Sequence, residues 1–230
     1  MGDVEQKFIF LARQKSLIHD WLDFHCVRDP KYYFSAVSTI YFDTPQLQLY
    51  REKRNGDYIK SKIRLRWYED WRKLMPGKTV RGFLELKRRV GVFRQKERIA
   101  IELTSQSLRD NPLKNQKIME LPVMMKQAAE NLPEMLAPML HIQYNRYRFI
   151  DPQSASRVSL DTDICCLNAN DDYIAGFPPV FLDAGVMEFK GECRELPATF
   201  MPIMEYITRD AFSKYGRCFE HLMQPISRVI

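Results

Sequence analysis

The sequence predicts one α+β domain over residues 1–230, built on an eight-stranded antiparallel β-barrel that forms a charged tunnel, with helices packed outside it. Three observations favour this fold class. About eight segments alternate apolar and polar residues with the period of two that is typical of β-strands, and eight strands suffice to close a small barrel. Most of these segments carry Lys or Arg on the polar face. The helical segments interrupt the strands without a change in composition that would mark a second domain.

The segment 58–68 shows the alternation most clearly. Lys62, Arg64 and Arg66 fall on one face of the predicted strand, and the residues between them are apolar. Three cations in a row repel one another, whereas a solvated strand face usually mixes both signs. A basic edge strand that discourages aggregation would explain this segment by itself. Because other strands repeat the pattern and one sheet cannot have several such edges, we expect these cations to point into a closed tunnel.

Alternation and a high content of β-branched and aromatic residues predict the strands. The expected ranges are 4–11, 34–42, 58–68, 80–90, 92–103, 141–150, 156–167 and 180–191. Turn signals separate several of them, such as Asn55-Gly56 before the third strand. In the seventh strand the alternation places Arg157, Ser159, Asp161 and Asp163 on one face.

The helices are predicted from apolar residues at helical spacing. A first helix is expected over 13–25, before Asp29-Pro30, and a short one over 46–53. The segment 104–140 is rich in Met, Leu, Gln and Pro and indicates two or three short helices broken at its prolines. A last helical segment over 197–222 is expected to be interrupted at 214–216.

Composition and charge exclude several function classes. The net charge of +6 favours a polyanionic partner. The five cysteines show no Cys-x-x-Cys spacing, so a zinc site is not expected. No Gly-x-x-x-x-Gly-Lys loop and no serine, histidine and acid spacing stands out. No apolar run approaches the roughly 20 residues of a membrane span, and the N-terminus lacks a secretion signal. We therefore expect a cytoplasmic protein.

Cations that line a tunnel would focus positive potential on an anion, and guanidinium groups match the geometry of phosphate oxygens. A few carboxylates lie among the cations. Glu188, Glu85 or Glu5 could hold a divalent cation that bridges phosphate oxygens. A salt bridge to a neighbouring Lys or Arg is the alternative for each, and it is the preferred interpretation for Glu85 and Glu5.

Short motifs follow one another in order over nearly the whole chain. They are residues 38–44 (Ser-Thr-Ile-Tyr-Phe-Asp-Thr), 62–68 (Lys-Ile-Arg-Leu-Arg-Trp-Tyr), 84–87 (Leu-Glu-Leu-Lys), 96–98 (Lys-Glu-Arg), 144–146 (Tyr-Asn-Arg), 157–161 (Arg-Val-Ser-Leu-Asp), 187–190 (Met-Glu-Phe-Lys) and 212–215 (Phe-Ser-Lys-Tyr). The ordered set resembles the VTC domain, the catalytic domain of the vacuolar transporter chaperone polyphosphate polymerase, within the triphosphate tunnel metalloenzyme superfamily with its CYTH-like fold.

The resemblance implies a tunnel whose basic residues bind a triphosphate or polyphosphate chain. The catalytic cations would be Arg64, Arg66, Lys87, Arg146 and Arg157. The other phosphate-binding residues would be Lys7, Lys62, Lys96, Tyr144, Ser213 and Lys214, with Lys214 over one tunnel mouth. Glu188 would bind Mn²⁺ or Mg²⁺. One metal is expected, because only Glu5-Gln6-Lys7 remains of the Glu-x-Glu-x-Lys start of other branches.

The resemblance also implies metal-dependent phosphoryl transfer, with polyphosphate synthesis from ATP as the leading hypothesis. A tripolyphosphatase or nucleoside triphosphatase on the same fold is one alternative, and a non-catalytic polyphosphate sensor is another. Nucleic acid is disfavoured as a partner because stacking aromatic residues are not interleaved with the cations.

The expected partners are ATP, inorganic triphosphate or polyphosphate. The N-terminal phosphate-sensing domain and the membrane helices of the eukaryotic complex do not occur in this sequence. We therefore expect a product released into the cytoplasm, or joint action with a separate membrane partner.

Overall fold

The computed structural model describes residues 4–128, 132–176, 178–192 and 196–224. These residues form β-strands and short helices. The strands are β1 (Val4–Phe10), β2 (Val27–Arg28), β3 (Phe34–Asp43), β4 (Ile59–Trp67), β5 (Thr79–Val90), β6 (Phe93–Thr104), β7 (Ala137–Ile150), β8 (Arg157–Ala169), β9 (Val180–Phe181), β10 (Gly185–Gly191) and β11 (Thr208–Arg209). The α-helices are α1 (Lys15–His25), α2 (Gln48–Asn55), α3 (Ser105–Arg109), α4 (Gln116–Met119), α5 (Leu121–Ala128) and α6 (Lys214–Met223), and the 3₁₀ segments are η1 (Ala12–Gln14), η2 (Trp71–Lys73) and η3 (Ala198–Tyr206).

The strands form one large sheet whose order is β11-β1-β10-β8-β7-β3-β4-β5-β6, with β2 beside β7 and β9 beside β8. All eight predicted strands are present, but the last one, predicted over 180–191, is divided into β9 and β10. The two additional strands, β2 and β11, have two residues each, too few to show a period. The predicted closed barrel is wrong. Within the described residues the strand order has two ends, β11 and β6, so the sheet is open. Alternation fixes how many strands form but not whether the first pairs with the last, because closure also depends on tilt and stagger.

The chain divides into two compact units. The N-terminal unit comprises residues 1–36, 144–165 and 181–214, and the central unit comprises 37–143, 166–180 and 215–230. Strands β3, β7, β8 and β9 contribute residues to both units. The prediction of a single domain over the whole chain stays a prediction.

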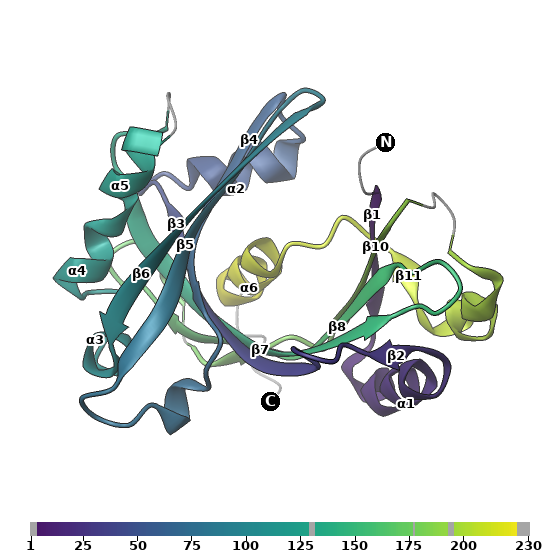
Figure 1. The fold of residues 1–230 in the computed structure, drawn as a ribbon. Helices are drawn as coiled ribbons and strands as arrows, with labels where there is room; N and C mark the ends of the chain where they lie inside the picture. The colour runs from purple at the N-terminus through teal and green to yellow at the C-terminus, as the bar shows by residue number, and fades with distance from the viewer. Residues whose placement is uncertain (1–3, 129–131, 177, 193–195, 225–230) are drawn as a thin grey trace, which may run out of the picture. The chain divides into compact units, whose positions relative to one another are not determined.

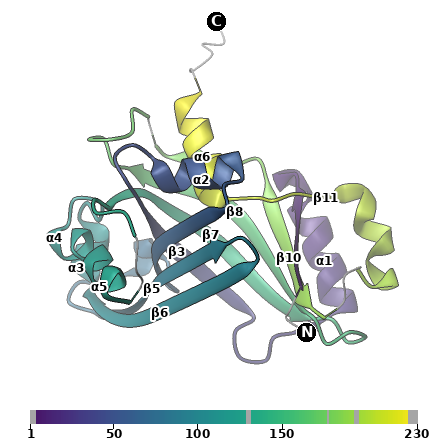
Figure 2. The same ribbon diagram turned by 90° about the horizontal axis from the view of Figure 1, so that it is seen from above.

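The central unit has a hydrophobic core on one face of β3 to β6. Ile63, Leu65 and Trp67 of β4 are fully buried there, as the alternation predicts. Helices α3, α4 and α5 lie together beside this part of the sheet (Figures 1 and 2) and contribute Leu108 and Ile118 to the same core. The two or three short helices predicted for 104–140 are present as three. Pro122 does not break a helix, because it lies in the first turn of α5, where proline is tolerated.

A buried carboxylate accepts hydrogen bonds from backbone N–H groups at the start of helix α2. Asp43, the last residue of β3, accepts hydrogen bonds from the backbone N–H groups of Leu49 (2.8 Å) and Tyr50 (2.9 Å) and from the hydroxyl of Tyr215 (3.0 Å). Since the first N–H groups of a helix have no partner within it, this arrangement ties α2 to β3. Tyr215 also stacks on Tyr41, with ring centroids 5.4 Å apart.

The last part of the chain differs from its prediction. The segment 198–206 is a 3₁₀ helix that contains Pro202, and residues 208–209 form β11 instead of continuing a helix. No interruption occurs at 214–216, because α6 starts at Lys214 and runs through Gly216. Tyr215 and Phe219 are buried, so packing of the helix outweighs the low helix propensity of the glycine.

The strands of the N-terminal unit also have one apolar face and one charged face. Phe8 of β1, Leu160 of β8 and Phe189 of β10 point to one face and are buried. Helix α1 covers this face with Ile18 and Leu22, which have no exposed surface. Figure 2 shows α1 beside β1 and β10. In both units, therefore, the opposite strand face carries the charged residues.

We predict that the two isoleucines of β4 differ sharply in their contribution to stability. Ile63 is fully buried and Ile59 is 43% exposed. Ile63→Ala should lower the free energy of unfolding by about 2–5 kcal/mol, because it leaves a cavity in the core. Ile59→Ala, the matched control, should lower it by less than about 1 kcal/mol. Urea denaturation followed by tryptophan fluorescence measures both, and equal losses would contradict the assignment of the buried face.

Candidate functional site

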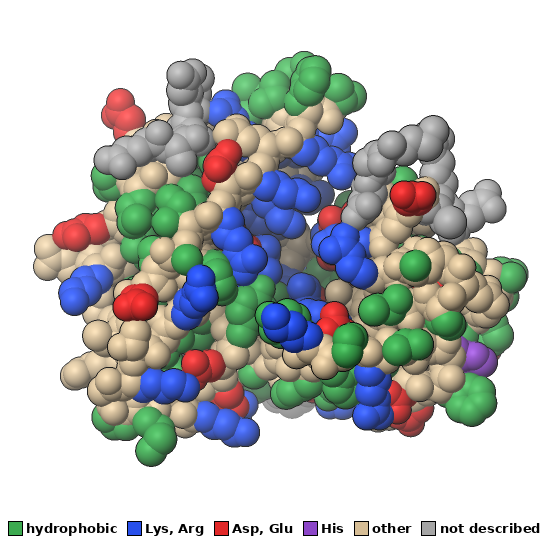
Figure 3. Space-filling view, in the orientation of Figure 1, with side chains coloured by type: hydrophobic (Ala, Val, Ile, Leu, Met, Phe, Trp, Pro, Cys, Tyr) green, Lys and Arg blue, Asp and Glu red, His purple; other side chains and the backbone are tan. Residues whose placement is uncertain are grey.

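Three rows of charged residues cross strands β4, β5 and β6 in the central unit. The pairing places one residue of each strand in register, and every position except one is Lys or Arg. The rows are Lys60–Arg89–Arg94, Lys62–Lys87–Lys96 and Arg64–Glu85–Arg98. Figure 3 shows Lys and Arg side chains gathered along these strands. Like charges directly opposite each other destabilise a sheet, so this face is suited to a polyanion that would relieve the repulsion.

Glu85 is the carboxylate within these rows. Its oxygens lie 2.7 Å from Arg64 Nε, 3.7 Å from Arg66 Nη1 and 3.5 Å from Arg98 Nε. Burial disfavours the charged form of Glu85, but the three guanidinium groups outweigh burial and hold its pKa below the ordinary value. Glu85 is thus an ionised anchor that orients the arginines, as the salt-bridge interpretation expects.

Arg66 is the most buried of these arginines, and part of it lacks a partner. Only 6% of the residue is exposed, and its Nε donates no hydrogen bond within the described residues. Thr39 of β3 stands directly opposite Arg66 in the pairing, and its Oγ1 is also buried without a hydrogen-bond partner there. Buried polar groups are normally satisfied, so these two neighbouring donors would both gain from a hydrogen-bond acceptor at this position.

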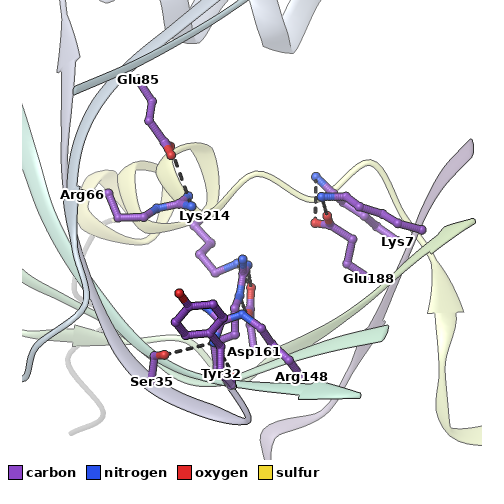
Figure 4. Close-up of polar contacts among 11 residues, drawn as sticks. Lys7, Tyr32, Ser35, Arg66, Glu85, Arg148, Asp161, Glu188 and Lys214 are labelled. Atoms are coloured by element: carbon purple, nitrogen blue, oxygen red, sulfur yellow. Dashed lines mark hydrogen bonds and ion pairs between the residues drawn. The ribbon is translucent and has the colours of Figure 1, made fainter. Parts of the chain in front are cut away.

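The charged face of the N-terminal unit begins with two acids and two bases on β1 and β10. Glu5 stands opposite Lys190, and Lys7 stands opposite Glu188. Lys7 Nζ is 2.9 Å from Glu5 Oε1 and 3.6 Å from Glu188 Oε2, and Lys190 forms ion pairs with the same two carboxylates. Figure 4 shows Lys7 and Glu188 pointing toward each other. We call these four residues the acid–base square.

Glu188 is the more buried acid of the square, with a side chain 13% exposed. Burial disfavours its charged form, but Lys7 and Lys190 outweigh burial and lower the pKa of Glu188 to about 2. Arg146 acts in the same direction. Glu188 is therefore ionised at neutral pH and able to serve as a metal ligand.

Another carboxylate of the N-terminal unit contacts two of the predicted site residues. Asp161 of β8 accepts two hydrogen bonds from Arg146, at 2.6 and 2.7 Å, and one from Lys214 Nζ at 2.5 Å. Lys214 Nζ also lies 4.4 Å from the centre of the Tyr144 ring. Burial raises the pKa of Asp161, but Arg146 and Lys214 outweigh it and hold that pKa well below its usual range. Figure 4 shows Asp161 and Lys214 in contact.

The remaining predicted residues lie near these groups. Arg157 is exposed and stands opposite Lys190 in the pairing of β8 with β10. Ser213 is half-buried and directly precedes α6. The structure therefore places five predicted cations, Lys62, Arg64, Arg66, Lys87 and Lys96, in the central unit. It places Lys7, Tyr144, Arg146, Arg157, Glu188, Ser213 and Lys214 in the N-terminal unit.

One predicted face assignment is wrong. Asp163 does not share the face of Asp161, because its φ of +52° breaks the alternation of β8. Its carboxylate instead contacts Lys15 of α1 at 2.6 Å and Asn145 at 3.1 Å.

Comparison with models of protein families shows to which family the chain belongs. The model of the VTC domain matches residues 4–223. The chain belongs to the VTC domain family. Membership and the basic strand faces together point to an enzyme that acts on triphosphates. No curated protein matches this VTC-domain chain.

Solved structures resemble the chain only distantly. A candidate adenylate cyclase from Bacillus halodurans has a TM-score of 0.47 and 16% identity, covering 89% of this chain and 90% of its own. A candidate adenylate cyclase from Vibrio parahaemolyticus has a TM-score of 0.45 and 12% identity, covering 96% of this chain and 98% of its own.

None of the helices in the described residues has the length and hydropathy needed to cross a bilayer.

The tunnel metalloenzyme family implies a divalent metal, and the donor set of the acid–base square fits one. Glu5 and Glu188 supply carboxylate oxygens on neighbouring strands, and both have a lowered pKa. Mg²⁺ is commonly bound by one or two carboxylates together with substrate phosphates and water. No cluster of three His, Cys, Asp or Glu residues occurs in the described part of the chain, so oxygens of the substrate would complete the set.

Several residues of this site were missed by sequence reasoning. Asp161, Lys190, Arg98 and Thr39 were not predicted as site residues. Asp161 shares its predicted face with Arg157, which was a usable signal. Thr39 gave no signal, because only the pairing of β3 with β4 brings it opposite Arg66.

We predict that Glu188 makes folding stability depend on pH. Its pKa falls from 4.5 to about 2 on folding, so the ionised form is favoured in the native state. This stabilisation is complete above pH 4.5 and is lost as the pH falls through about 2. It should amount to roughly 3 kcal/mol. Urea denaturation across this range should show a smaller pH slope for Glu188→Gln than for the wild type.

The matched control is Glu102→Gln, on the exposed side of β6. This variant should keep the wild-type slope. A slope that Glu188→Gln leaves unchanged would contradict the ion pairs of the acid–base square.

Proposed function

We propose that this VTC-domain protein transfers phosphoryl groups from ATP to polyphosphate and so lengthens the polymer. The observation that supports this most directly is the pair of unsatisfied groups, Arg66 Nε and Thr39 Oγ1, beside rows of cations. A phosphate oxygen would accept hydrogen bonds from both. A fork-shaped guanidinium held by Glu85 is also preorganised for a phosphate, so little reorganisation is needed on binding.

The cations of each unit would bind phosphate groups. Arg64, Arg66, Lys62, Lys87 and Lys96 would do so in the central unit. Lys7, Arg146, Arg157, Lys214, Tyr144 and Ser213 would do so in the N-terminal unit. Asp161 would act as a positioning residue, because it fixes Arg146 and Lys214 with three hydrogen bonds and leaves the group with a net positive charge.

The reaction requires no covalent intermediate with the protein. An oxygen at the end of the acceptor forms a bond to the γ-phosphorus of ATP. The bond from that phosphorus to the bridging oxygen breaks, and its electron pair leaves with ADP. The products are ADP and a chain longer by one phosphate. Positioning and charge neutralisation by Lys and Arg supply most of the catalysis in reactions of this kind.

Glu188, with Glu5 beside it, would hold one Mn²⁺ or Mg²⁺. The metal would neutralise charge on phosphate oxygens. Lys7 and Lys190 now contact both carboxylates, and they would turn to the substrate when a metal binds.

The reducing cytoplasm is our proposed compartment. Four cysteines of the described residues, Cys26, Cys165, Cys166 and Cys218, are buried. The five cysteines of the sequence are an odd number and show no spaced framework of the kind found in disulfide-rich secreted domains. A separate membrane partner could then receive the polymer.

Hydrolysis is the second candidate, with water in place of the phosphate acceptor. Lys87 and Lys96 are exposed, so solvent reaches this part of the charged face. The same cations would then serve a tripolyphosphatase or nucleoside triphosphatase.

One assay separates these functions. The purified protein is incubated with ATP and Mn²⁺, and separately with tripolyphosphate and Mn²⁺, and polymer is resolved on a gel while free phosphate is measured. Polymer is expected. Free phosphate without polymer would support the hydrolase. Tight polyphosphate binding without turnover, unchanged in Glu188→Gln without metal, would support a sensor.

We predict that Arg66→Ala lowers kcat about 30- to 1000-fold, which corresponds to a loss of about 2–4 kcal/mol of transition-state stabilisation. The matched control is Arg81→Ala, an exposed arginine on the neighbouring strand β5, which should keep wild-type kcat. Steady-state kinetics of ATP consumption measures both, with circular dichroism as a check of folding. An equal loss in the two variants would point to general destabilisation.

We further predict that Thr39→Val separates binding from stability. Valine removes a buried hydroxyl that has no partner, so the free energy of unfolding should stay the same or rise by about 1 kcal/mol. Binding of tripolyphosphate should weaken roughly 5- to 10-fold through the lost hydrogen bond. Thr199→Val in η3 removes a similarly unsatisfied hydroxyl far from the charged strands in sequence, and it should leave tripolyphosphate binding unchanged. Calorimetric titration tests the pair, and unaltered binding in Thr39→Val would exclude a ligand at this position.

A further inference from the structure

The end of the β5–β6 hairpin exposes hydrophobic side chains next to the start of β4. Val92 and Phe93 are 81% and 76% exposed, and Tyr58 and Ile59 are 71% and 43% exposed. Figure 3 shows a hydrophobic cap over the end of this hairpin. Single exposed hydrophobic residues are common, but contiguous ones at a protruding end mark an interaction surface. We call these four residues the hairpin tip.

The hairpin tip is a defined structure. Gly91 turns the chain with a φ of +57°, and its N–H donates to the carbonyl of Tyr58 at 2.9 Å. A Cβ on Gly91 would lie 2.7 Å from the Tyr58 ring, so the ring packs directly against the turn. Arg89 Nε donates to the carbonyl of Gly91 at 2.6 Å. These contacts fix the backbone of the turn, on which the apolar side chains are exposed.

Cations follow directly behind the tip. Ile59, Val90 and Phe93 form the last row of the pairing, and Lys60, Arg89 and Arg94 form the next. The row Lys62–Lys87–Lys96 comes two residues further on, about 7 Å along the strands. Neither basic row contains a carboxylate. An apolar end backed by basic residues matches the order of acyl chains and anionic headgroups at a membrane surface.

We propose that the hairpin tip inserts into the surface of an anionic phospholipid membrane. Val92, Phe93 and Tyr58 would enter the boundary of the acyl chains. Lys60, Arg89 and Arg94 would contact headgroup phosphates. A protein partner is the less favoured occupant, because the centre of a protein interface is depleted of charge and this patch is small with a rim of one sign. The inference goes beyond the proposed function, since membrane binding needs no turnover.

Vesicle co-sedimentation of the full chain tests the proposal. The chain should bind vesicles of phosphatidylcholine with phosphatidylserine and should bind pure phosphatidylcholine vesicles weakly. Added salt should release it, because headgroup attraction is screened. The double variant Val92→Ser, Phe93→Ser should lower the partition coefficient about ten-fold. Its conversion of ATP in the absence of vesicles should equal that of the wild type, which separates membrane binding from catalysis.

The matched control uses the same residue types elsewhere on the surface. Val27 and Phe24 are 56% and 85% exposed, and Val27→Ser with Phe24→Ser should keep wild-type vesicle binding. No vesicle binding by the wild type would overturn the proposal. So would binding that the tip variant retains, or an equal loss in both double variants. A wild-type dimer on size exclusion that only the tip variant abolishes, without vesicle binding, would assign the tip to a protein interface and overturn it as well.

Discussion

Ion pairs between a few buried carboxylates and a larger number of Lys and Arg side chains organise both charged faces of this chain. Glu85 contacts three arginines, and Asp161 contacts Arg146 and Lys214. Each carboxylate lowers the cost of holding cations close together, yet each group keeps a net positive charge. A buried ion pair adds little net stability, because desolvation offsets the attraction. What the carboxylates contribute is fixed guanidinium and ammonium positions, which a phosphate-binding protein needs before its ligand arrives.

The charged faces depend on apolar packing behind them. In the central unit, Leu65 and Trp67 are buried between the cations of β4, and in the N-terminal unit Phe189 is buried beside Glu188 and Lys190. Helices cover these residues in each unit separately. A strand that alternates in this way gains stability on one face and can therefore tolerate repulsion on the other. The two units therefore combine a buried apolar face with a charged face in the same way.

Much of this architecture could be predicted from the sequence, because a period of two both identifies a strand and assigns its faces. The positions of Arg64 and Arg66 opposite the buried residues of β4 followed from that period alone. What the period could not supply was long-range pairing. The register that brings Thr39 opposite Arg66, the bond from Lys214 to Asp161 and the open ends of the sheet all join segments distant in the chain. The positive φ at Asp163, which interrupts the alternation of β8, could not be predicted either, because no residue type in the sequence marks it.

The acid–base square on β1 and β10 also determines how these two strands can align. A slip of one residue would expose the apolar face. A slip of two would keep that face buried but would bring Lys7 opposite Lys190 or Glu5 opposite Glu188, and the like charges would oppose it. The pairing of β4 with β5 lacks this safeguard, since a two-residue slip would place Lys62 opposite Glu85 and relieve a repulsion. Correct alignment there rests on the apolar face and the Gly91 turn. The square is therefore a folding signal as well as a candidate metal site, and substitutions in it would change the choice between alternative strand alignments.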